Sequence, residues 1–463
     1  MTLEDGSVMK LASGFIEYDG ERVGPVGRPP HPGEHTDEVF ADLGTPRPAP
    51  SGPRPEPAPP LADLSVLDFG HGGVGVETGR LFAEYGADVV KIESRSYPDF
   101  IRVVLGGEMS PSFASSSRSK RSFGVDMKSE QGRELLLRLA ESAHVVIENN
   151  STGTMDRLGL GFADFRRRNP GIVMMSSQLM GSRGRWADWR GYGPNTQVTG
   201  GMTHLWNYED LDEPAGSQSI FPDHFAGRVG AVAALAALVG RERLGLDATH
   251  AEVCQVEQVV GVMADLLALE SLAPGTVRPR GNHSDRGVPW GLYPCAGDDR
   301  WVAVCVRDDA EWAALVEVLG SPPWAADPAL AGVEGRRAAE ALIDEHLAAW
   351  TAGLDRYEVT DRLLAAGVPA GPMLTAVDQL HDPHFAAKGF AVWLDQPPIG
   401  RLAMEGAGFD ATGMVGPRIA PAPLLGEHTR DIARHTLGLD DDEIDTLIAE
   451  GILEITDTGG DTP

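Results

Sequence analysis

Cysteine is scarce in this chain of 463 residues, which contains only Cys254, Cys295 and Cys305. Their spacing matches neither a disulfide framework nor the paired ligands of a cysteine metal site. We therefore expect neither disulfides nor a bound metal, and the thiols favour a reducing cytoplasmic setting.

Long apolar stretches are also missing. No apolar run approaches the roughly 20 residues that span a bilayer, and the first residues, MTLEDGSVMK, do not match a signal peptide. A composition of 42% hydrophobic and 23% charged residues is typical of a soluble globular protein. The sequence therefore predicts no membrane association.

Basic residues are few, with 39 Lys and Arg against 68 Asp and Glu, and the formal net charge is −29. Such an excess of negative charge argues against nucleic acids and anionic membranes as partners. An anionic small molecule could still bind, but only where Arg, Lys and helix N-termini gather locally.

Proline is concentrated in residues 45–60, where eight prolines predict an extended linker. Residues 13–44, just before it, match residues 407–438, with Gly-Phe, Val-Gly, a proline-rich run and Gly-Glu-His-Thr in the same order. We interpret residues 1–44 as a segment that resembles the C-terminal tail of a second copy of one domain. Chance similarity between proline-rich segments is the alternative.

The middle of the chain alternates between strand and helix patterns. Apolar runs predict strands at 66–69, 88–92, 144–147 and 172–176, and helices are expected at 77–85, 129–142, 161–168 and 223–240. This order predicts an α/β fold, with a Rossmann-like parallel sheet covered by helices on both faces. We expect a large domain of residues 61–255 and 385–463, and a smaller α+β domain of residues 280–380 that begins with a strand pair.

A glycine-rich turn follows the first of these strands. Gly73, Gly75 and Gly79 form GxGxxxG, and Glu93 follows eighteen residues after Gly75. This pattern suits the pyrophosphate and ribose of NAD, but the same glycines also serve tight packing in any doubly wound sheet. No His-Asp or Tyr-Lys pair downstream is spaced for hydride transfer, which argues against NAD.

Positive charge gathers in residues 115–136, 145–162 and 186–193, and at Arg95. Lys120, Arg121 and Lys128 could simply be a solvated face. The alternative is a ligand site, because each cluster adjoins a predicted strand at the sheet edge where ligands of α/β folds bind.

Several of these segments together carry a resemblance. ADVVKIE, SKRSFGVDMKSEQGRELLLRLAESAHVVIEN, MDRLGLGFADFRRRNPGIV, GVPAGPM and PLLGEHT look like the succession found in class III CoA-transferases, the family of formyl-CoA and carnitine CoA-transferases. The resemblance covers about residues 61–450. It implies a cytoplasmic, interlocked homodimer whose Rossmann-like large domain holds CoA rather than NAD, and which acts on an acyl-CoA and a small carboxylic acid.

The resemblance also implies a set of CoA-binding residues. Arginine suits phosphate because it donates bidentate hydrogen bonds, and lysine supplies a compact charge. In this family Arg follows KIE, whereas here Ser94 takes that place and Arg95 comes next. The positions implied as CoA-binding are Gly73, Arg95, Val125, Lys128, Asn149, Arg157 and Arg190.

The catalytic candidate is Asp223, at the start of a long helix rich in Ala, Gly and Val. From the residues alone it could be an ordinary N-cap. The resemblance implies that it is the nucleophile, which forms a mixed anhydride with the acyl group and then an aspartyl-CoA thioester. Tyr192 and His224 are expected to line the substrate pocket.

Two other activities remain open. The α-methylacyl-CoA racemases share the fold and use a histidine base where this chain has Tyr192, so a racemase or isomerase is disfavoured. The chain also departs from the family at the glutamine position, here Gly73, in ENNSTG at 148–153, and in GNHSDRGVP at 281–289. A CoA-binding subunit without turnover is therefore the second alternative.

Overall fold

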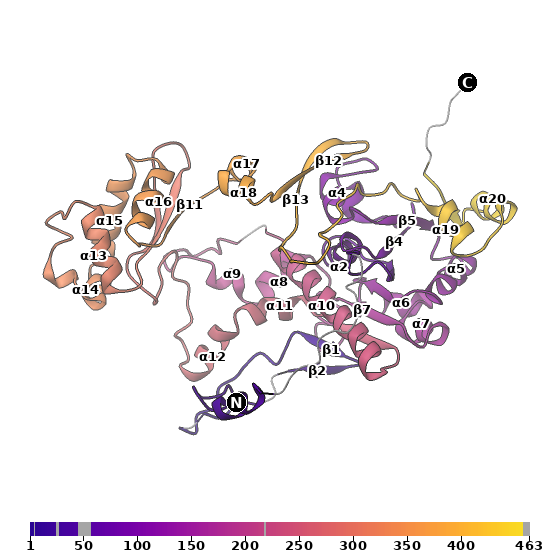
Figure 1. Ribbon diagram of the computed structural model, residues 1–463, viewed down its shortest axis with the longest axis horizontal. Helices are drawn as coiled ribbons and strands as arrows, with labels where there is room; N and C mark the ends of the chain where they lie inside the picture. Colours follow the sequence, from indigo (N-terminus) through magenta and orange to yellow (C-terminus); the bar gives the residue numbers. More distant parts are fainter. Residues whose placement is uncertain (4, 25–26, 45–56, 217–218, 457–463) are drawn as a thin grey trace. The chain divides into compact units, whose positions relative to one another are not determined.

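The computed structural model describes residues 1–3, 5–24, 27–44, 57–216 and 219–456 (Figure 1). Most of the predicted linker at 45–60 lies outside these residues. The chain divides into two compact units. The large unit comprises residues 1–202, 217–277 and 389–463, and the small unit comprises residues 203–216 and 278–388.

The described residues of the large unit build a nine-stranded sheet in the order β14-β5-β4-β3-β6-β7-β8-β1-β2, whose six central strands run parallel. The chain moves outward from β3 through β4 to β5, then returns to the other side of β3 as β6, β7 and β8. This change of direction places a ligand-binding crevice at the carboxyl ends of β3 and β6. The strands are β1 (Ile16–Tyr18), β2 (Glu21–Val23), β3 (Ser65–Asp68), β4 (Asp88–Glu93), β5 (Arg121–Val125), β6 (Val145–Glu148), β7 (Val173–Ser176), β8 (Thr249–Glu252) and β14 (Leu453–Glu454).

The predicted α/β class is confirmed, and the four predicted strands appear within one residue of their expected bounds. The basic segment that contains Arg121 forms β5, and β8 was also missed. The basic side chains at the start of β5 and the short, mixed sequence THAE of β8 obscure the apolar run that marks a buried strand.

Helices cover both faces of this sheet (Figure 1). Alternate strand residues such as Leu67 and Ile92 pack with α5, α7, α19 and α20 on one face, whereas Val66 and Val89 pack with α2 and α10 on the other. The helices of the large unit are α1 (Thr36–Asp42), α2 (Val74–Glu84), α3 (Phe100–Val103), α4 (Pro111–Ser116), α5 (Glu130–Ala140), α6 (Thr154–Leu158), α7 (Phe162–Arg168), α8 (Gly193–Thr199), α10 (Phe221–Leu244), α11 (Gln255–Val262), α12 (Ala264–Leu272), α19 (Thr429–His435) and α20 (Asp441–Ala449).

Three antiparallel pairings add segments from both ends of the chain to the large sheet. Strand β1 pairs antiparallel with β8 and with β2, and β14 pairs antiparallel with β5. A separate hairpin of β12 (Ala391–Gln396) and β13 (Gly400–Glu405) precedes α19.

The small unit has its own core. Its described residues form an antiparallel sheet of β9 (Trp290–Pro294), β10 (Trp301–Cys305) and β11 (Ala370–Pro372), and its helices bury Trp312, Ile343 and Leu363 against it. The helices are α13 (Asp309–Val318), α14 (Val333–Ala338), α15 (Glu340–Thr351), α16 (Arg356–Ala365), α17 (Ala376–His381) and α18 (Pro383–Ala387), with a short 3₁₀ turn at Pro328–Leu330; α9 (Met202–Leu205) spans the boundary between the units.

Candidate active site

Asp223 lies in the first turn of α10, three residues after its N-cap, Ile220. The N-cap interpretation of Asp223 is therefore wrong, because the helix begins earlier than the sequence indicated. Burial raises the pKa of the Asp223 carboxyl to about 6, and the charge of the neighbouring His224 offsets part of that effect. A carboxyl group that only caps a helix is rarely buried to this extent.

Two glycines leave space for this carboxyl group. A Cβ on Gly193 would lie 1.9 Å from Asp223 Oδ2, and one on Gly73 would lie 2.6 Å from the Asp223 Cβ. Gly73 is the N-cap of α2, so the first-turn N–H groups of α2, which have no acceptor within the helix, begin beside Asp223. Asp223 is thus enclosed by three chain segments and lies at the N-termini of both α2 and α10.

An aromatic pair lies over the same turn. Tyr192 precedes Gly193, is 63% exposed, and packs its ring edge-on against Phe100 with 5.4 Å between ring centroids. Phe100 also contacts Gly72, where a Cβ would lie 2.6 Å from its ring. Tyr192 therefore lies next to the catalytic candidate, and Phe100 is a neighbour that sequence reasoning missed.

His224 points to Glu77 of α2, with 3.4 Å between Nδ1 and Oε2. Glu77 is buried and also pairs with Arg80 at 2.7 Å and with Arg228 at 3.3 Å. Burial raises the pKa of Glu77, but the hydrogen bond with His224 and the charge of Arg80 outweigh it and lower the pKa to about 2. The Glu77 carboxylate therefore ties the first turn of α10 to α2, a role that its place inside an apolar helix did not reveal.

Polar side chains that are buried or half-buried fix the glycine-rich turn. Asn149 accepts from the N–H of His71 at 2.7 Å and donates to its carbonyl at 2.8 Å. Asp68 accepts from Gly70 N, Asp99 accepts from Gly72 N, and Lys91 donates to Gly70 O. Asn149, which the resemblance implied as a CoA-binding residue, therefore helps to hold the turn beside Asp223. Asp68, Lys91 and Asp99, which hold it too, were not singled out from the sequence.

Lys120 belongs to this buried network rather than to a solvated face or a ligand cluster. Its ammonium group donates at 2.7 Å to both Asp68 Oδ2 and Val76 O, and the residue is 4% exposed. Burial lowers the pKa of Lys120, and its ion pair with Asp68 favours the charged form. Arg121, by contrast, pairs with Asp88 and Asp431 near the surface. Neither side chain is available to a ligand.

The acid required by the dinucleotide pattern is also buried. Glu93 has no exposed surface and pairs with Arg102, at 2.5 Å from the guanidinium. Burial raises the pKa of Glu93, but the hydrogen bond and charge of Arg102 lower it to about 2. A carboxylate so engaged cannot bind the ribose of NAD.

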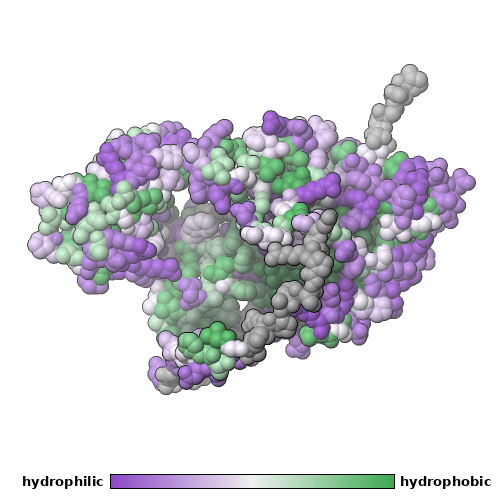
Figure 2. All heavy atoms as spheres, viewed as in Figure 1, coloured by the Kyte–Doolittle hydropathy of each residue, from purple (hydrophilic) through white to green (hydrophobic). Residues whose placement is uncertain are grey.

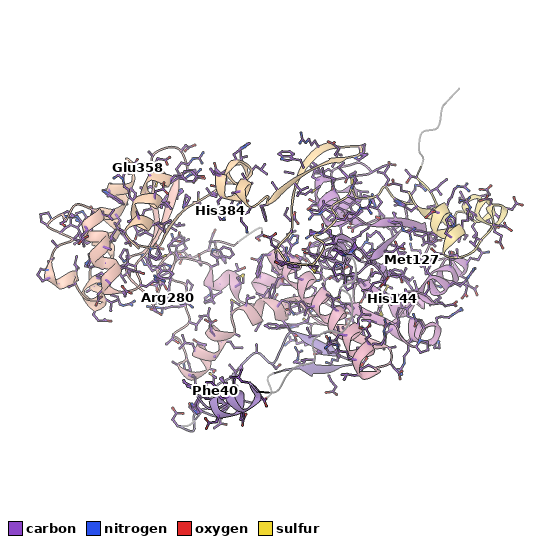
Figure 3. The ribbon with its side chains drawn as sticks, viewed as in Figure 1. Phe40, Met127, His144, Arg280, Glu358 and His384 are labelled. Atoms are coloured by element: carbon purple, nitrogen blue, oxygen red, sulfur yellow. The ribbon has the colours of Figure 1, made fainter. Side chains whose placement is uncertain are left out.

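A cavity lies beyond this turn, at the carboxyl ends of β3, β4, β5 and β6. Lys128 lines it, and its ammonium group has no acidic partner among the described residues. Arg157 lies on α6, whose Thr154, Met155 and Leu158 line the cavity, and donates to Thr154 Oγ1 at 2.9 Å. The cavity is lined by Phe69, His71, Ser94, Ser96, Tyr97, Asp126, Met127, Lys128, Asn150, Thr154, Met155 and Leu158; Met127 is labelled in Figure 3.

The other predicted CoA-binding positions are placed differently. The Val125 side chain is fully buried in the core, and Arg95 contacts Glu454 and the Ile455 carbonyl of the C-terminal segment. Arg190 is exposed in the loop before Tyr192, where a stack of Trp186 and Trp189 precedes it. All six positions other than Arg190 therefore lie at this edge of the sheet, but the Arg95 side chain contacts the C-terminal segment and the Val125 side chain is in the core.

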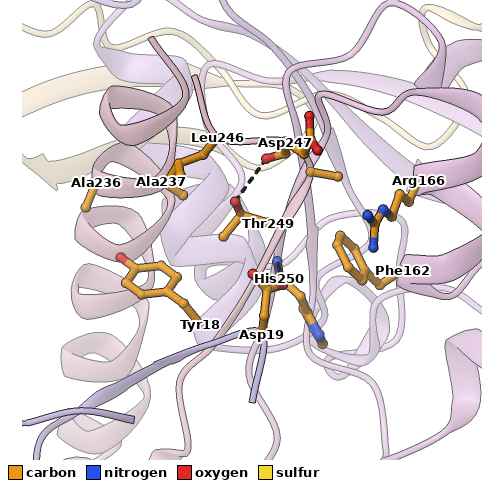
Figure 4. A pocket seen from close by; sticks show the side chains of 11 residues that line it. Tyr18, Asp19, Phe162, Arg166, Ala236, Ala237, Leu246, Asp247, Thr249 and His250 are labelled. Atoms are coloured by element: carbon orange, nitrogen blue, oxygen red, sulfur yellow. Dashed lines mark hydrogen bonds between the residues drawn. The ribbon is translucent and has the colours of Figure 1, made fainter. Parts of the chain in front are cut away.

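Another cavity, shown in Figure 4, lies at the opposite end of β8 between α10 and β1. There His250 stacks on Phe162 and hydrogen-bonds to Ser176 Oγ at 2.9 Å. It is lined by Tyr18, Asp19, Phe162, Arg166, Ala236, Ala237, Leu246, Asp247, Ala248, Thr249 and His250. None of the predicted site residues lines it, and parallel sheets bind ligands at their carboxyl ends instead.

The loop at 281–289 lies in the small unit. His283 Nε2 is 3.0 Å from Asp344 Oδ2, and Tyr293 donates to Asp344 Oδ1 at 2.6 Å. These residues line a surface cavity together with Arg280, which Figure 3 labels. Among the described residues, no cluster of His, Cys, Asp and Glu is arranged to hold a metal ion, and no helix is long and apolar enough to cross a membrane.

Comparisons with known proteins point to one family. The family model of CoA-transferase family III matches residues 61–429. A probable CoA-transferase of Mycobacterium tuberculosis, Rv1866, is 34% identical over 452 residues, which cover 96% of this chain but 56% of that protein. The chain thus spans little more than half the length of that relative. A succinyl-CoA–D-citramalate CoA-transferase of Chloroflexus aurantiacus is 30% identical over 86% of this chain and 99% of its own length.

Solved structures show the same fold. A CAIB/BAIF family protein from Brucella suis superposes with a TM-score of 0.73 at 28% identity, covering 82% of this chain and 99% of its own. Rv3272 from Mycobacterium tuberculosis superposes with a TM-score of 0.70 at 26% identity, covering 81% and 99%. The expected family is confirmed: this chain belongs to CoA-transferase family III.

Proposed function

We propose that this chain transfers CoA from an acyl-CoA to a carboxylic acid, with Asp223 as the nucleophile. The observation that carries the proposal is the enclosure of the Asp223 carboxyl between Gly73 and Gly193 at two helix N-termini. Curated relatives are named for transfer from succinyl-CoA or formyl-CoA to D-citramalate, L-malate or oxalate. We infer a short dicarboxylic acid as the acceptor.

The reaction proceeds in four balanced steps. An Asp223 oxygen attacks the thioester carbonyl, forms a mixed anhydride and expels CoA thiolate. The thiolate attacks the aspartyl carbonyl carbon, which gives an aspartyl-CoA thioester and releases the donor acid. The acceptor carboxylate and then the thiolate repeat these steps in reverse, so that the new acyl-CoA leaves and the Asp223 carboxylate is regenerated.

Nearby groups suit these steps. N–H groups in the first turn of α2, which have no acceptor within the helix, can donate to the oxyanion of each tetrahedral intermediate. The Glu77–His224 contact fixes the turn that carries Asp223. The racemase alternative stays disfavoured because Tyr192 stands where the racemases carry their histidine base. Lys128 and Arg157 supply positive charge at the cavity where CoA would lie.

Trapping the intermediate tests this function. The protein is incubated with succinyl-CoA or formyl-CoA, then treated with hydroxylamine, and the Asp223 peptide is analysed by mass spectrometry. We expect an aspartyl hydroxamate that forms only with acyl-CoA, and transfer of CoA to malate, citramalate or oxalate. Transfer without modification of Asp223 would contradict the covalent route, and CoA binding without transfer would support the non-catalytic alternative.

The rate should depend on pH through Asp223. Its pKa of about 6 means that the attacking carboxylate is lost as the pH falls below that value. We expect kcat/KM for the donor to fall about tenfold per pH unit below pH 6 and to level off above it. Measuring kcat/KM from pH 4.5 to 8 checks this. A profile that stays flat down to pH 5 would mean that Asp223 has an ordinary pKa in solution.

Binding of CoA should stabilise the fold, and Lys128 should contribute to it. A ligand at about 100 times its Kd adds roughly 2.7 kcal/mol, so thermal melts with CoA should shift upward whereas melts with NAD should not.

Lys128→Ala is expected to weaken the binding of CoA by roughly 1.5–3 kcal/mol, because one charged hydrogen bond is lost. Stabilisation by NAD instead, or an unchanged Kd for CoA in Lys128→Ala, would argue against the assigned cavity.

Assembly and location are part of the proposal. Family resemblance supports an interlocked homodimer, which sedimentation velocity would detect. Three free cysteines support a reducing cytoplasmic setting.

A further inference from the structure

The segment of residues 33–43 folds as a copy of residues 426–436. Gly33 and Gly426 both adopt left-handed backbone conformations, with φ of 83° and 72°. The N-caps that follow, His35 and His428, share a φ of −110° and have ψ of 16° and 12°. The sequence repeat is therefore also a repeat of local structure.

One side-chain contact is repeated in the same register. The Glu34 carboxylate accepts from the N–H three residues earlier at 2.7 Å, and the Glu427 carboxylate does the same at 2.8 Å. The contact and the cap geometry are therefore repeated together with the Gly-Glu-His-Thr sequence. Helix α1 is thus equivalent to α19.

The two helices differ in what covers them. In α19, Thr429, Ile432 and Ala433 have no exposed surface, because this helix packs against β5 beside the short strand β14. Gly124 N donates to Thr429 Oγ1 at 2.9 Å, and His428 N donates to Ser122 O at 3.1 Å.

In α1, the two residues that match the buried Ile432 and Ala433 are exposed. Val39 is 58% exposed, Phe40 is 66% exposed, and Leu43, at the end of the helix, is 70% exposed. Figure 3 labels Phe40 on this segment, and Figure 2 shows apolar side chains at its surface. A helix of seven residues is marginal in water without a packed face, so α1 needs a partner.

We propose that α1 is the closing helix of a second CoA-transferase family III domain, distinct from this chain, and docks on the strand of that domain equivalent to β5. Glu38 occupies the position of Asp431, which pairs with Arg121 at 3.0 Å, so the partner strand should begin with a basic residue. The match to Rv1866 leaves nearly half of that relative unaligned, which is room for such a domain.

A second copy of this chain does not fit as the occupant. Its own α19 already covers β5, and Phe40 stands where Ala433 is fully buried. A phenylalanine ring has no space at that position, because packed cores tolerate added volume poorly. The partner domain must therefore leave more space around Phe40 than this chain leaves around Ala433.

An exchange series in the full chain tests the equivalence. Residues 427–436 are replaced by the sequence of residues 34–43, either completely or with Ala433 kept. The exchange that keeps Ala433 should melt within about 5 °C of the wild type, and the complete exchange should melt at least about 10 °C lower. The control is the exchange that keeps Ala433 and carries Ile432→Asp instead of the valine taken from position 39. It should melt as low as the complete exchange or lower.

Two outcomes would overturn the proposal. If the exchange that keeps Ala433 melts no higher than its Asp control, α1 does not have the sequence of a closing helix. If the complete exchange is as stable as the one that keeps Ala433, this chain itself accepts Phe40. Sedimentation velocity adds a separate readout: Phe40→Asp should leave the assembly of the full chain unchanged, and a loss of mass would show that α1 binds a second copy.

Discussion

Asp223→Asn is expected to lower kcat by at least about 10³-fold, which corresponds to about 4 kcal/mol of lost transition-state stabilisation. The amide has nearly the same shape but cannot form the anhydride. Because burial raises the pKa of Asp223, the fold already favours a neutral side chain at this position, and the variant should remain folded. Steady-state transfer assays measure the loss, and thermal shift with CoA should show that binding persists.

Glu242→Gln is the matched control, because Glu242 lies on the same helix but is exposed at its far end. It should retain wild-type turnover and stability. If Asp223→Asn kept turnover within tenfold of the wild type, another group would have to be the nucleophile. If instead it lost CoA binding together with turnover, the site would have been disturbed rather than the chemistry removed.

Gly193→Ala should reduce kcat by on the order of 100-fold and also lower the melting temperature. The added methyl group would lie 1.9 Å from Asp223 Oδ2, so either α8 or the carboxyl group must move. A displacement of about 1 Å at a reacting atom can cost about 10²-fold in rate. Turnover of the variant and its melting temperature with and without CoA give the two readouts.

The companion substitution Gly416→Ala separates this clash from the general effect of losing a glycine. A Cβ at Gly416 meets no atom within 4 Å, and its backbone does not require glycine. We expect wild-type turnover and an unchanged or slightly higher melting temperature. Equal turnover in the two glycine variants would show that Asp223 has more room than the structure gives it.

The sequence determined the framework of this protein. Apolar runs of four or five residues placed four of the six parallel strands within one residue, because the central positions of these strands are buried on both faces of the sheet. The order of short motifs was sufficient to predict the family, and the family model and curated relatives confirm it. The repeated Gly-Glu-His-Thr led to the interpretation of residues 1–44 as a segment that resembles the tail of a second copy of one domain, which stays a prediction.

Roles that depend on neighbours distant in sequence were decided only by the tertiary structure. The sequence left Lys120 as either a solvated surface charge or part of a ligand cluster, and Glu93 as the acid of a disfavoured dinucleotide pattern. In the structure both are buried in ion pairs, with Asp68 and Arg102. Nothing in the sequence singled out Glu77, which lies inside an apolar helix, but its carboxylate ties α2 to the turn that carries Asp223. A pattern of residue types states what a side chain can do, whereas burial and the nearest opposite charge decide whether it is available, and both are fixed only when the chain packs.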